Sequence, residues 1–189
     1  MKLLKDRIIK DGTISKGNIL RVDSFINHQI DVNLLNEVSK EFKKRFEGKK
    51  ITKILTIEVS GIAIASIAAQ YFNVPVVFAK KHQGINLDPD SYESHVFSYT
   101  KKQPYTIKVS KKYINEDDHL LIIDDFLASG SAMCGLIDIV EQANATISGV
   151  GILIEKSFQE GRSILEEKNI QTESLAMIKS IENGKVEFI

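Results

Sequence analysis

The sequence predicts a single α/β domain with a central, mostly parallel sheet flanked by helices. Two stretches support this prediction, because residues 51–81 and 119–157 each read as a strand, a helix and a second strand. Parallel strands joined in this way have right-handed crossovers, which cover both faces of a sheet with helices. At 189 residues, the chain has the length of one domain with a real core.

The first stretch begins with "ITKILTIEVSG", an apolar and β-branched run that ends at Gly61. "IAIASIAAQYF" follows with the small and apolar residues of a buried helix, and "VPVVFAKK" is a second short strand. In the second stretch, "HLLIID" and "ATISGVGILIEKS" flank a helical pattern over 132–143. Ligands of such sheets bind beyond the carboxyl ends of the strands. Residues 58–61, 80–81 and 124–131 are therefore expected on one rim.

Three segments lie outside this alternation. Residues 1–48 contain the amphipathic helical pattern "VNLLNEVSKEFKKRF" and are expected to form an N-terminal cap. Residues 161–189 are expected to contain a helix and a hairpin, whose turn is marked by Asn183-Gly184, and to complete the cap. Residues 49–160 are the expected core. Within it, residues 82–110 are long for a loop, and loops of this length are often flexible lids, although residues after Asp90 alternate as in strands.

Composition narrows the expected partners and compartment. Lys and Arg total 25 and Asp and Glu total 25, so no net charge attracts the chain to nucleic acid or to anionic lipid. The N-terminal residues mix acids with bases and lack the apolar core of a secretory signal, and no apolar run has the length of a membrane span. The single cysteine, Cys134, cannot form an internal disulfide. We expect a cytoplasmic protein with no nucleic-acid or membrane partner.

The segment "DDFLASGSA", residues 124–132, carries the clearest chemical signal. Its small polar residues lie where a strand turns into a helix, so their backbone amides and hydroxyls can form a concave phosphate site. The lysine of a GxxxxGK[ST] loop is missing, which disfavours triphosphate hydrolysis. Asp124 and Asp125 would repel a phosphate, so we expect them to face sugar hydroxyls, directly or through Mg²⁺. Alone, an acid pair before a serine is also typical of an ordinary helix start.

This segment consists of two acids, two further residues and a small loop that contains Ser and Gly, and an apolar run precedes it. The pattern resembles the 5-phosphoribosyl 1-pyrophosphate (PRPP) signature of the type I phosphoribosyltransferases. The resemblance implies their fold, with Asp124 and Asp125 on the ribose hydroxyls and Mg²⁺ bound together with PRPP rather than by the protein alone. It also implies that a backbone loop holds the 5-phosphate, here Ala128, Ser129, Gly130, Ser131 and Ala132. Many members have Thr where Ala132 stands, so one side-chain contact is absent.

The same resemblance extends to the pyrophosphate side of the site. "EVSG" resembles the family's pyrophosphate loop, which implies contacts from Ser60 and Gly61, and a basic residue at Lys81 would approach the same group. A plain strand-to-helix turn and a solvated strand end remain alternative interpretations of these two segments. The long segment after Lys81 resembles the family's catalytic lid and contains the pair Ser91-Tyr92, as several purine enzymes do. A lid would keep water from the ribosyl cation.

The whole chain resembles bacterial phosphoribosyltransferases that act on xanthine, through "GNILRVDSFINHQID", "EVSGIAIA" and "IEKSFQEGR". This resemblance implies xanthine contacts from Leu20, Asn27 and Lys156, and a homodimer. Lysine is a pure donor, which suits a 6-oxopurine and rejects the amino group of adenine. Phe158 is either a stacking partner of the ring or a buried core residue.

The expected reaction joins xanthine to the phosphoribosyl group of PRPP, releasing pyrophosphate, in purine salvage. Two alternatives stay open at this point: an enzyme of the same family that prefers hypoxanthine or guanine, and a PRPP-sensing purine regulator with the same fold. The N-terminal segment lacks a basic helix-turn-helix pattern and both acids are present, which favours the enzyme.

Overall fold

A computed structural model describes residues 1–15, 18–81, 89–98 and 103–189. Over these residues the chain forms one eight-stranded sheet, in the order β10-β9-β8-β7-β3-β4-β6-β5, and a separate two-stranded sheet, β1-β2. The five strands from β9 to β4 are mutually parallel, and β10, β6 and β5 pair antiparallel at the two edges. The predicted α/β fold with a mostly parallel sheet is confirmed.

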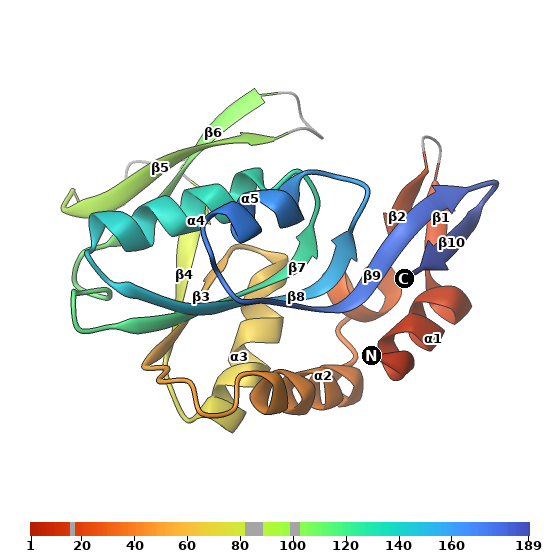
Figure 1. The fold of residues 1–189 in the computed structure, drawn as a ribbon, viewed down its shortest axis with the longest axis horizontal. Coiled ribbons are helices and arrows are strands. Elements are labelled where there is room, and N and C mark those ends of the chain that lie inside the picture. The colour runs from red at the N-terminus through yellow and green to blue at the C-terminus, as the bar shows by residue number, and fades with distance from the viewer. Residues whose placement is uncertain (16–17, 82–88, 99–102) are drawn as a thin grey trace.

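The two predicted strand-helix-strand units form the centre of the molecule. The first consists of β3 (Lys53–Ile57), α3 (Ser60–Phe72) and β4 (Val76–Lys81). The second consists of β7 (His119–Leu127), α4 (Ser131–Gln142) and β8 (Thr146–Lys156), and it continues into α5 (Gly161–Glu167) and β9 (Thr172–Glu182). Figure 1 shows α4 and α5 on one face of the sheet and α2 and α3 on the other. Each face therefore has its own apolar core.

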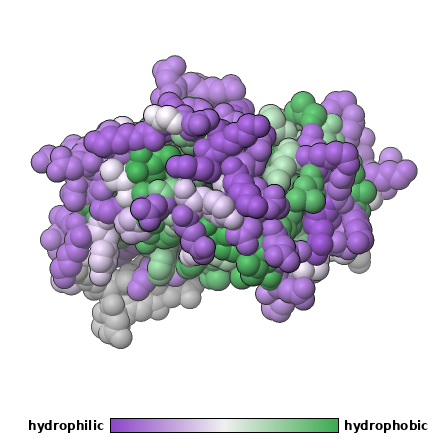
Figure 2. Space-filling view, turned by 90° about the horizontal axis from the view of Figure 1, so that it is seen from below, coloured by the Kyte–Doolittle hydropathy of each residue, from purple (hydrophilic) through white to green (hydrophobic). Residues whose placement is uncertain are grey.

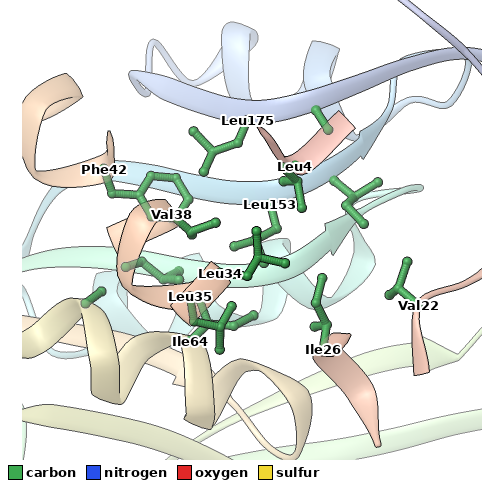
Figure 3. Close-up of a cluster of buried hydrophobic side chains, with 14 of the residues drawn as sticks. Leu4, Val22, Ile26, Leu34, Leu35, Val38, Phe42, Ile64, Leu153 and Leu175 are labelled. Carbon is green, nitrogen blue, oxygen red and sulfur yellow. The ribbon is translucent and has the colours of Figure 1, made fainter. Parts of the chain in front are cut away.

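Helix α2 (Val32–Arg45) shows how the sequence produces this packing. The Asp31 carboxylate accepts a hydrogen bond from the Leu34 amide at 3.0 Å, which caps the first turn. Apolar residues at helical spacing, including Leu34, Val38 and Phe42, are buried against α3, β8 and β9 (Figure 3). Seen from the α2 side, much of the surface is hydrophilic (Figure 2). None of the helices in the described ranges is long and apolar enough to cross a membrane.

The predicted cap is present and draws on both ends of the chain. It contains α1 (Lys2–Asp11), β1 (Thr13–Ser15), β2 (Ile19–Arg21), the π-helical turn η1 (Asp23–Asn27) and β10 (Lys185–Phe188). These elements gather at one end of the molecule in Figure 1. The β9-β10 hairpin turns at Asn183 and Gly184, which have φ angles of 50° and 72°, as predicted. The segment boundaries at residues 48 and 160 stay predictions.

Two parts of the fold differ from the expectation. Helix α1 was not expected, because charged residues interrupt its apolar pattern and only Leu4 and Ile8 are buried. Much of the segment expected to be a long loop is a hairpin of β5 (Ser91–Ser98) and β6 (Gln103–Ser110), as the alternating residues after Asp90 predicted, and it buries one face against α4. The rest of that expected loop, residues 82–88 and 99–102, lies outside the described residues.

Candidate active site

A cavity of about 220 Å³ opens at the carboxyl ends of β3, β4 and β7. The lining residues come from the three rim segments expected from the sequence and from the hairpin: Ile57, Glu58, Val59, Ser60, Gly61, Lys81, Tyr105, Asp124, Asp125, Phe126 and Ala132. Parallel sheets bind ligands at this edge, because loops diverge there and leave a crevice. The predicted convergence of the three segments is therefore present in the structure.

The two acids lie inside strand β7 rather than beyond its end. The strand continues past them because Phe126 and Leu127 still pair with β8, opposite Ile154 and Glu155. Each acid also accepts a hydrogen bond from the next backbone amide, Asp124 from Asp125 and Asp125 from Phe126, both at 2.9 Å. The continued pairing fixes both carboxylates on a rigid element.

The two carboxylates differ in their electrostatic setting. Asp124 is 6% exposed, whereas Asp125 is partly exposed. Burial raises the pKa of Asp124 well above its usual value, and the neighbouring charge of Asp125 raises it further. Lys81 opposes this shift. Asp124 therefore has a deficit of positive charge and hydrogen-bond donors, which sugar hydroxyls or a cation would relieve.

The loop at residues 128–132 presents free backbone donors. Gly130 has a φ angle of 84° and precedes the first turn of α4, a conformation that favours glycine. The Cys134 amide is the first after this turn that donates to a backbone carbonyl, to Gly130 O at 2.8 Å. Within the described part of the chain, the amides of residues 129–133 donate to no backbone carbonyl. This arrangement, with the helix dipole behind it, suits a phosphate.

Neighbouring elements hold the loop in place from two sides. The Gly161 amide at the start of α5 donates to Ala128 O at 2.9 Å. From the hairpin, the Phe97 amide donates to Ser131 Oγ at 3.1 Å. The loop is thus packed against α5 and linked to β5, so its donors have fixed positions before any ligand binds.

The segment from Glu58 to Gly61 lines the same cavity as the acids. Its Glu58–Val59 peptide bond is cis. A Cβ atom on Gly61 would lie 2.0 Å from Thr56 Oγ1 and 3.3 Å from Asp124 Oδ1, so the backbone approaches β3 and β7 more closely than any side chain allows. Ser60 and Gly61 therefore lie beside the acids, as expected.

Lys81 and Tyr105 also line this cavity. The Lys81 amide donates to Glu58 Oε1 at 2.5 Å, and its ammonium lies 5.5 Å from the centre of the Tyr105 ring. Burial raises the pKa of Tyr105, and the charge of Asp124 adds to the shift. Sequence reasoning missed Tyr105, because it comes from β6 and no local motif marks it.

The three residues expected to contact a purine differ in where they lie. Asn27 Nδ2 donates to Asp125 Oδ2 at 3.0 Å, so the cap reaches the acid pair directly. Lys156 Nζ lies 5.7 Å from the centre of the Phe126 ring, and burial lowers the pKa of Lys156. The side chain of Leu20 instead is 5% exposed and packs in the apolar core of the cap. Only its backbone is available to a ligand.

A larger cavity, of about 510 Å³, lies next to Lys156 on the side of the cap. It is lined by Asn18, Ile19, Lys156, Phe158, Gln159 and residues 179–182 of β9. Phe158 is 52% exposed, so its interpretation as a buried core residue is wrong. Ile19 rather than Leu20 faces this cavity, because successive residues of β2 point to opposite sides.

Comparison with known proteins identifies the family. The phosphoribosyl transferase domain matches residues 27–186. This chain is a member of the phosphoribosyltransferase family. A curated relative from Clostridium novyi (strain NT), "Xanthine phosphoribosyltransferase", is 65% identical over 188 residues, which cover 100% of this chain and 99% of the relative. The protein of the same name from Clostridium tetani (strain Massachusetts / E88) is 62% identical, with 100% of both chains covered.

Solved phosphoribosyltransferases share the fold at much lower sequence identity. APRTase from Giardia lamblia, complexed with 9-deazaadenine, superposes with a TM-score of 0.79 at 22% identity and covers 94% of this chain and 98% of that one. Adenine phosphoribosyltransferase from Rhodothermus marinus DSM 4252 gives 0.77 at 20% identity, covering 94% and 100%. The predicted type I phosphoribosyltransferase fold is therefore confirmed.

Proposed function

We propose that this protein is a xanthine phosphoribosyltransferase, a pentosyltransferase of purine salvage. It transfers the 5-phosphoribosyl group of PRPP to N9 of xanthine and releases xanthosine monophosphate and pyrophosphate. The observation that carries the proposal is full-length similarity, at 65% identity, to a curated enzyme with this name. The cavity that joins the acid pair to two backbone loops supports it from the geometry.

PRPP would bind along the rim, with its three parts in three places. The free amides of residues 129–132 and the peptide group of Ala128 form the 5-phosphate site. Asp124 and Asp125 accept hydrogen bonds from the ribose hydroxyls, which relieves the unfavourable burial of Asp124. Ser60, Gly61 and Lys81 face the pyrophosphate, and Lys81 supplies positive charge on that side.

The chemistry requires positioning and charge stabilisation rather than a covalent nucleophile. Breaking the bond between C1 of ribose and pyrophosphate gives an oxocarbenium-like transition state, and the purine nitrogen then bonds to C1. Preorganised groups lower this barrier by fixing both reactants and by matching the developing charge. The acids on β7 fulfil both needs, because they hold the ribose and place negative charge beside the cationic ring.

Mg²⁺ fits this cavity as a companion of PRPP. Within the described residues, His, Cys, Asp and Glu form no group of three that could hold a metal ion. Mg²⁺ in proteins often keeps several waters and is bound by one or two carboxylates and substrate phosphates. Asp124 and Asp125 are the carboxylates that would hold it through such ligands. When bound, the ion offsets the negative charge of the leaving pyrophosphate.

The purine would lie between the acid pair and the cap. Lys156 donates to an oxo group and has no acceptor to offer the amino group of adenine. The amide of Asn27 can serve the 2-position of the purine, and the backbone of Leu20 contacts the ring from the cap. The exposed Phe158 borders the larger cavity beside Lys156 and is available for stacking.

Three further properties complete the proposal. The protein acts as a homodimer in the cytoplasm, without nucleic-acid or membrane partners. Ser91 and Tyr92 lie in strand β5, where they pair with Ser110 and Val109 of β6. Light scattering of the purified protein, with and without PRPP, tests the dimer directly.

A Mg²⁺-dependent PRPP assay with xanthine, guanine, hypoxanthine and adenine in parallel tests the proposed function. We expect kcat/KM to be highest for xanthine and turnover to stop when EDTA removes the metal. Activity led by guanine or hypoxanthine would keep the reaction and reject xanthine as the substrate. Absence of turnover with every base would reject the enzyme and favour a PRPP-sensing regulator.

A further inference from the structure

A buried ion pair joins the end of β8 to the start of α5 and lines neither of the two cavities. Glu155 precedes Lys156 at the end of β8 and is 1% exposed. Its carboxylate accepts hydrogen bonds from Arg162 Nε at 3.2 Å and from Arg162 Nη2, so the pair is bidentate. Ser157 Oγ donates to it at 3.0 Å, and Ser174 Oγ donates from β9. A buried carboxylate with this many donors has a fixed position.

Arg162 extends the same network to strand β9. Its Nη1 group donates to Thr172 O at 2.9 Å, and Nη2 donates to Ser174 Oγ at 3.0 Å. Burial alone would raise the pKa of Glu155, but the hydrogen bonds from Arg162 and Ser174 lower it. Glu155 is therefore a carboxylate at neutral pH, and the orientation of Arg162 follows from three acceptors.

The residue before Arg162 touches the phosphate loop. The Gly161 amide donates to Ala128 O at 2.9 Å, and a Cβ atom on Gly161 would lie 2.5 Å from the same oxygen. From the other side, a Cβ atom on Gly130 would lie 3.0 Å from Gly161 Cα. The start of α5 and the loop are in such close contact that a small movement of one must move the other.

We propose that Glu155 and Arg162 are a positioning pair that couples the purine end of the site to the 5-phosphate loop. Glu155 is followed in the chain by Lys156. Arg162 is preceded by Gly161, whose amide donates to Ala128 O in the phosphate loop. The pair touches no substrate. It fixes the distance between the Lys156 ammonium, which donates to the purine, and the loop amides that bind the 5-phosphate. This distance must be correct for N9 of the purine to reach C1 of the ribose. This inference rests on the proposed function.

Arg162→Lys is the informative substitution, because it keeps the charge and removes the bidentate geometry. We expect KM to rise for both PRPP and xanthine and kcat/KM to fall roughly 10- to 100-fold, because a shift near 1 Å has effects of this size. We also expect weaker binding of ribose 5-phosphate, measured by calorimetry as a probe of the phosphate and ribose subsites without the purine. Added guanidinium should partly restore turnover of an Arg162→Ala variant.

Arg45→Lys is the matched control. Arg45 also pairs with a glutamate on β9, with Nη1 3.2 Å from Glu173 Oε2, and its side chain is 27% exposed against 22% for Arg162. Its side chain donates hydrogen bonds to Glu41, Glu173 and the carbonyl of Ser174, and none of these bonds goes to the phosphate loop or to Lys156. Both variants should lose some thermal stability, but only Arg162→Lys should change the two KM values.

The outcomes separate the coupling from the proposed function. Turnover by the unmodified protein tests the function alone, whereas ribose 5-phosphate binding by the variants reports on the phosphate and ribose subsites even without turnover. Unchanged KM values and ribose 5-phosphate affinity in Arg162→Lys would reject the positioning role. A change in only one of the two KM values would reject the coupling, because the pair would then serve a single subsite.

Discussion

The two halves of the candidate site are assembled in different ways. The half proposed to bind PRPP comes largely from one continuous segment, residues 124–132, in which strand, loop and helix follow each other. The half proposed to bind the purine combines Asn27 from η1 and Lys156 from β8, which are far apart in the sequence. The first half depends on local backbone geometry, so its disruption should abolish the reaction. The second depends on the packing of the cap, so its changes should be graded.

The acid pair offers the largest expected effect. Replacing Asp125 by Asn keeps the shape of the side chain but removes the charge that we propose faces the ribose and the cationic transition state. We expect kcat/KM to fall about 10²- to 10³-fold or more, as for loss of one preorganised electrostatic group, and the double variant with Asp124→Asn to be inactive. Circular dichroism should show an intact fold. Normal turnover in the double variant would remove the acids from the ribose site.

Asp124→Asn has a second consequence, for stability. The folded pKa of Asp124 is raised above the unfolded value of 3.8, so the folded state binds the proton more tightly. Stability is then lost as pH rises from 3.8 through the raised pKa. At pH 7 the Asn variant should melt at a higher temperature than the unmodified protein, and this gain should vanish near pH 3.8. A lower melting temperature at pH 7 would contradict the buried, unrelieved charge.

The phosphate loop gives the next effect. Gly130→Ala adds a side chain where φ is 84° and where its Cβ would lie 3.0 Å from Gly161 Cα. Gly48→Ala is the matched control, since φ is 78° there but nothing lies within 4 Å. Both variants should lose about 1–2 kcal/mol of stability in thermal unfolding. Only Gly130→Ala should also weaken the binding of PRPP, which should lower kcat/KM roughly 10²-fold.

Equal kinetics in the two glycine variants would mean that the loop tolerates movement. The amides at 129–133 would then not be preorganised, and the comparison between a rigid phosphate half and a graded purine half would fail. Measuring KM for PRPP at saturating xanthine separates this outcome from a simple loss of folded protein, because unfolding lowers the apparent kcat and leaves KM unchanged.

The same contrast explains what the sequence could predict. Apolar runs and a helical period predict the strands and helices of segments 51–81 and 119–157. The order of these elements, the parallel sheet and the rim position of residues 124–132 therefore follow from local patterns. Strand β7 extends past the acids because of its pairing with β8. That extension depends on a neighbouring strand, and no local signal encodes it.

The remaining elements depend on contacts between distant residues. Helix α1 buries only Leu4 and Ile8, so its stability comes from packing on β9 and η1 rather than from a strong period. Tyr105 reaches the cavity because β6 pairs with β4 at Lys80 and Lys81. The bond from Asn27 to Asp125 spans 98 residues. Such pairings depend on the whole fold, so sequence patterns alone did not reveal them.

Lys156 tests the purine half with an intermediate effect. Lys156→Met keeps most of the apolar stem and removes the donor, so kcat/KM for xanthine should fall about 10- to 100-fold, as for loss of a charged hydrogen bond. Lys179→Met is the control, because Lys179 lines the same larger cavity but pairs with Glu187 at 2.7 Å. An equal loss in both variants would indicate general attraction of the base by positive charge instead of a specific contact.

Asn27 should give the smallest effect and the sharpest information about the base. Its Nδ2 group donates to Asp125, and its amide can face either an oxo or an amino group at the 2-position after a flip. Asn27→Ala removes a neutral hydrogen bond of similar value to xanthine and to guanine, so kcat/KM should fall about two- to tenfold for each base. Asn33→Ala, at an exposed position of α2, should change neither. If xanthine turnover falls and guanine turnover does not, the amide is held in one orientation. The hydrogen bond from Asn27 to Asp125 would then contribute to the selection of the substrate.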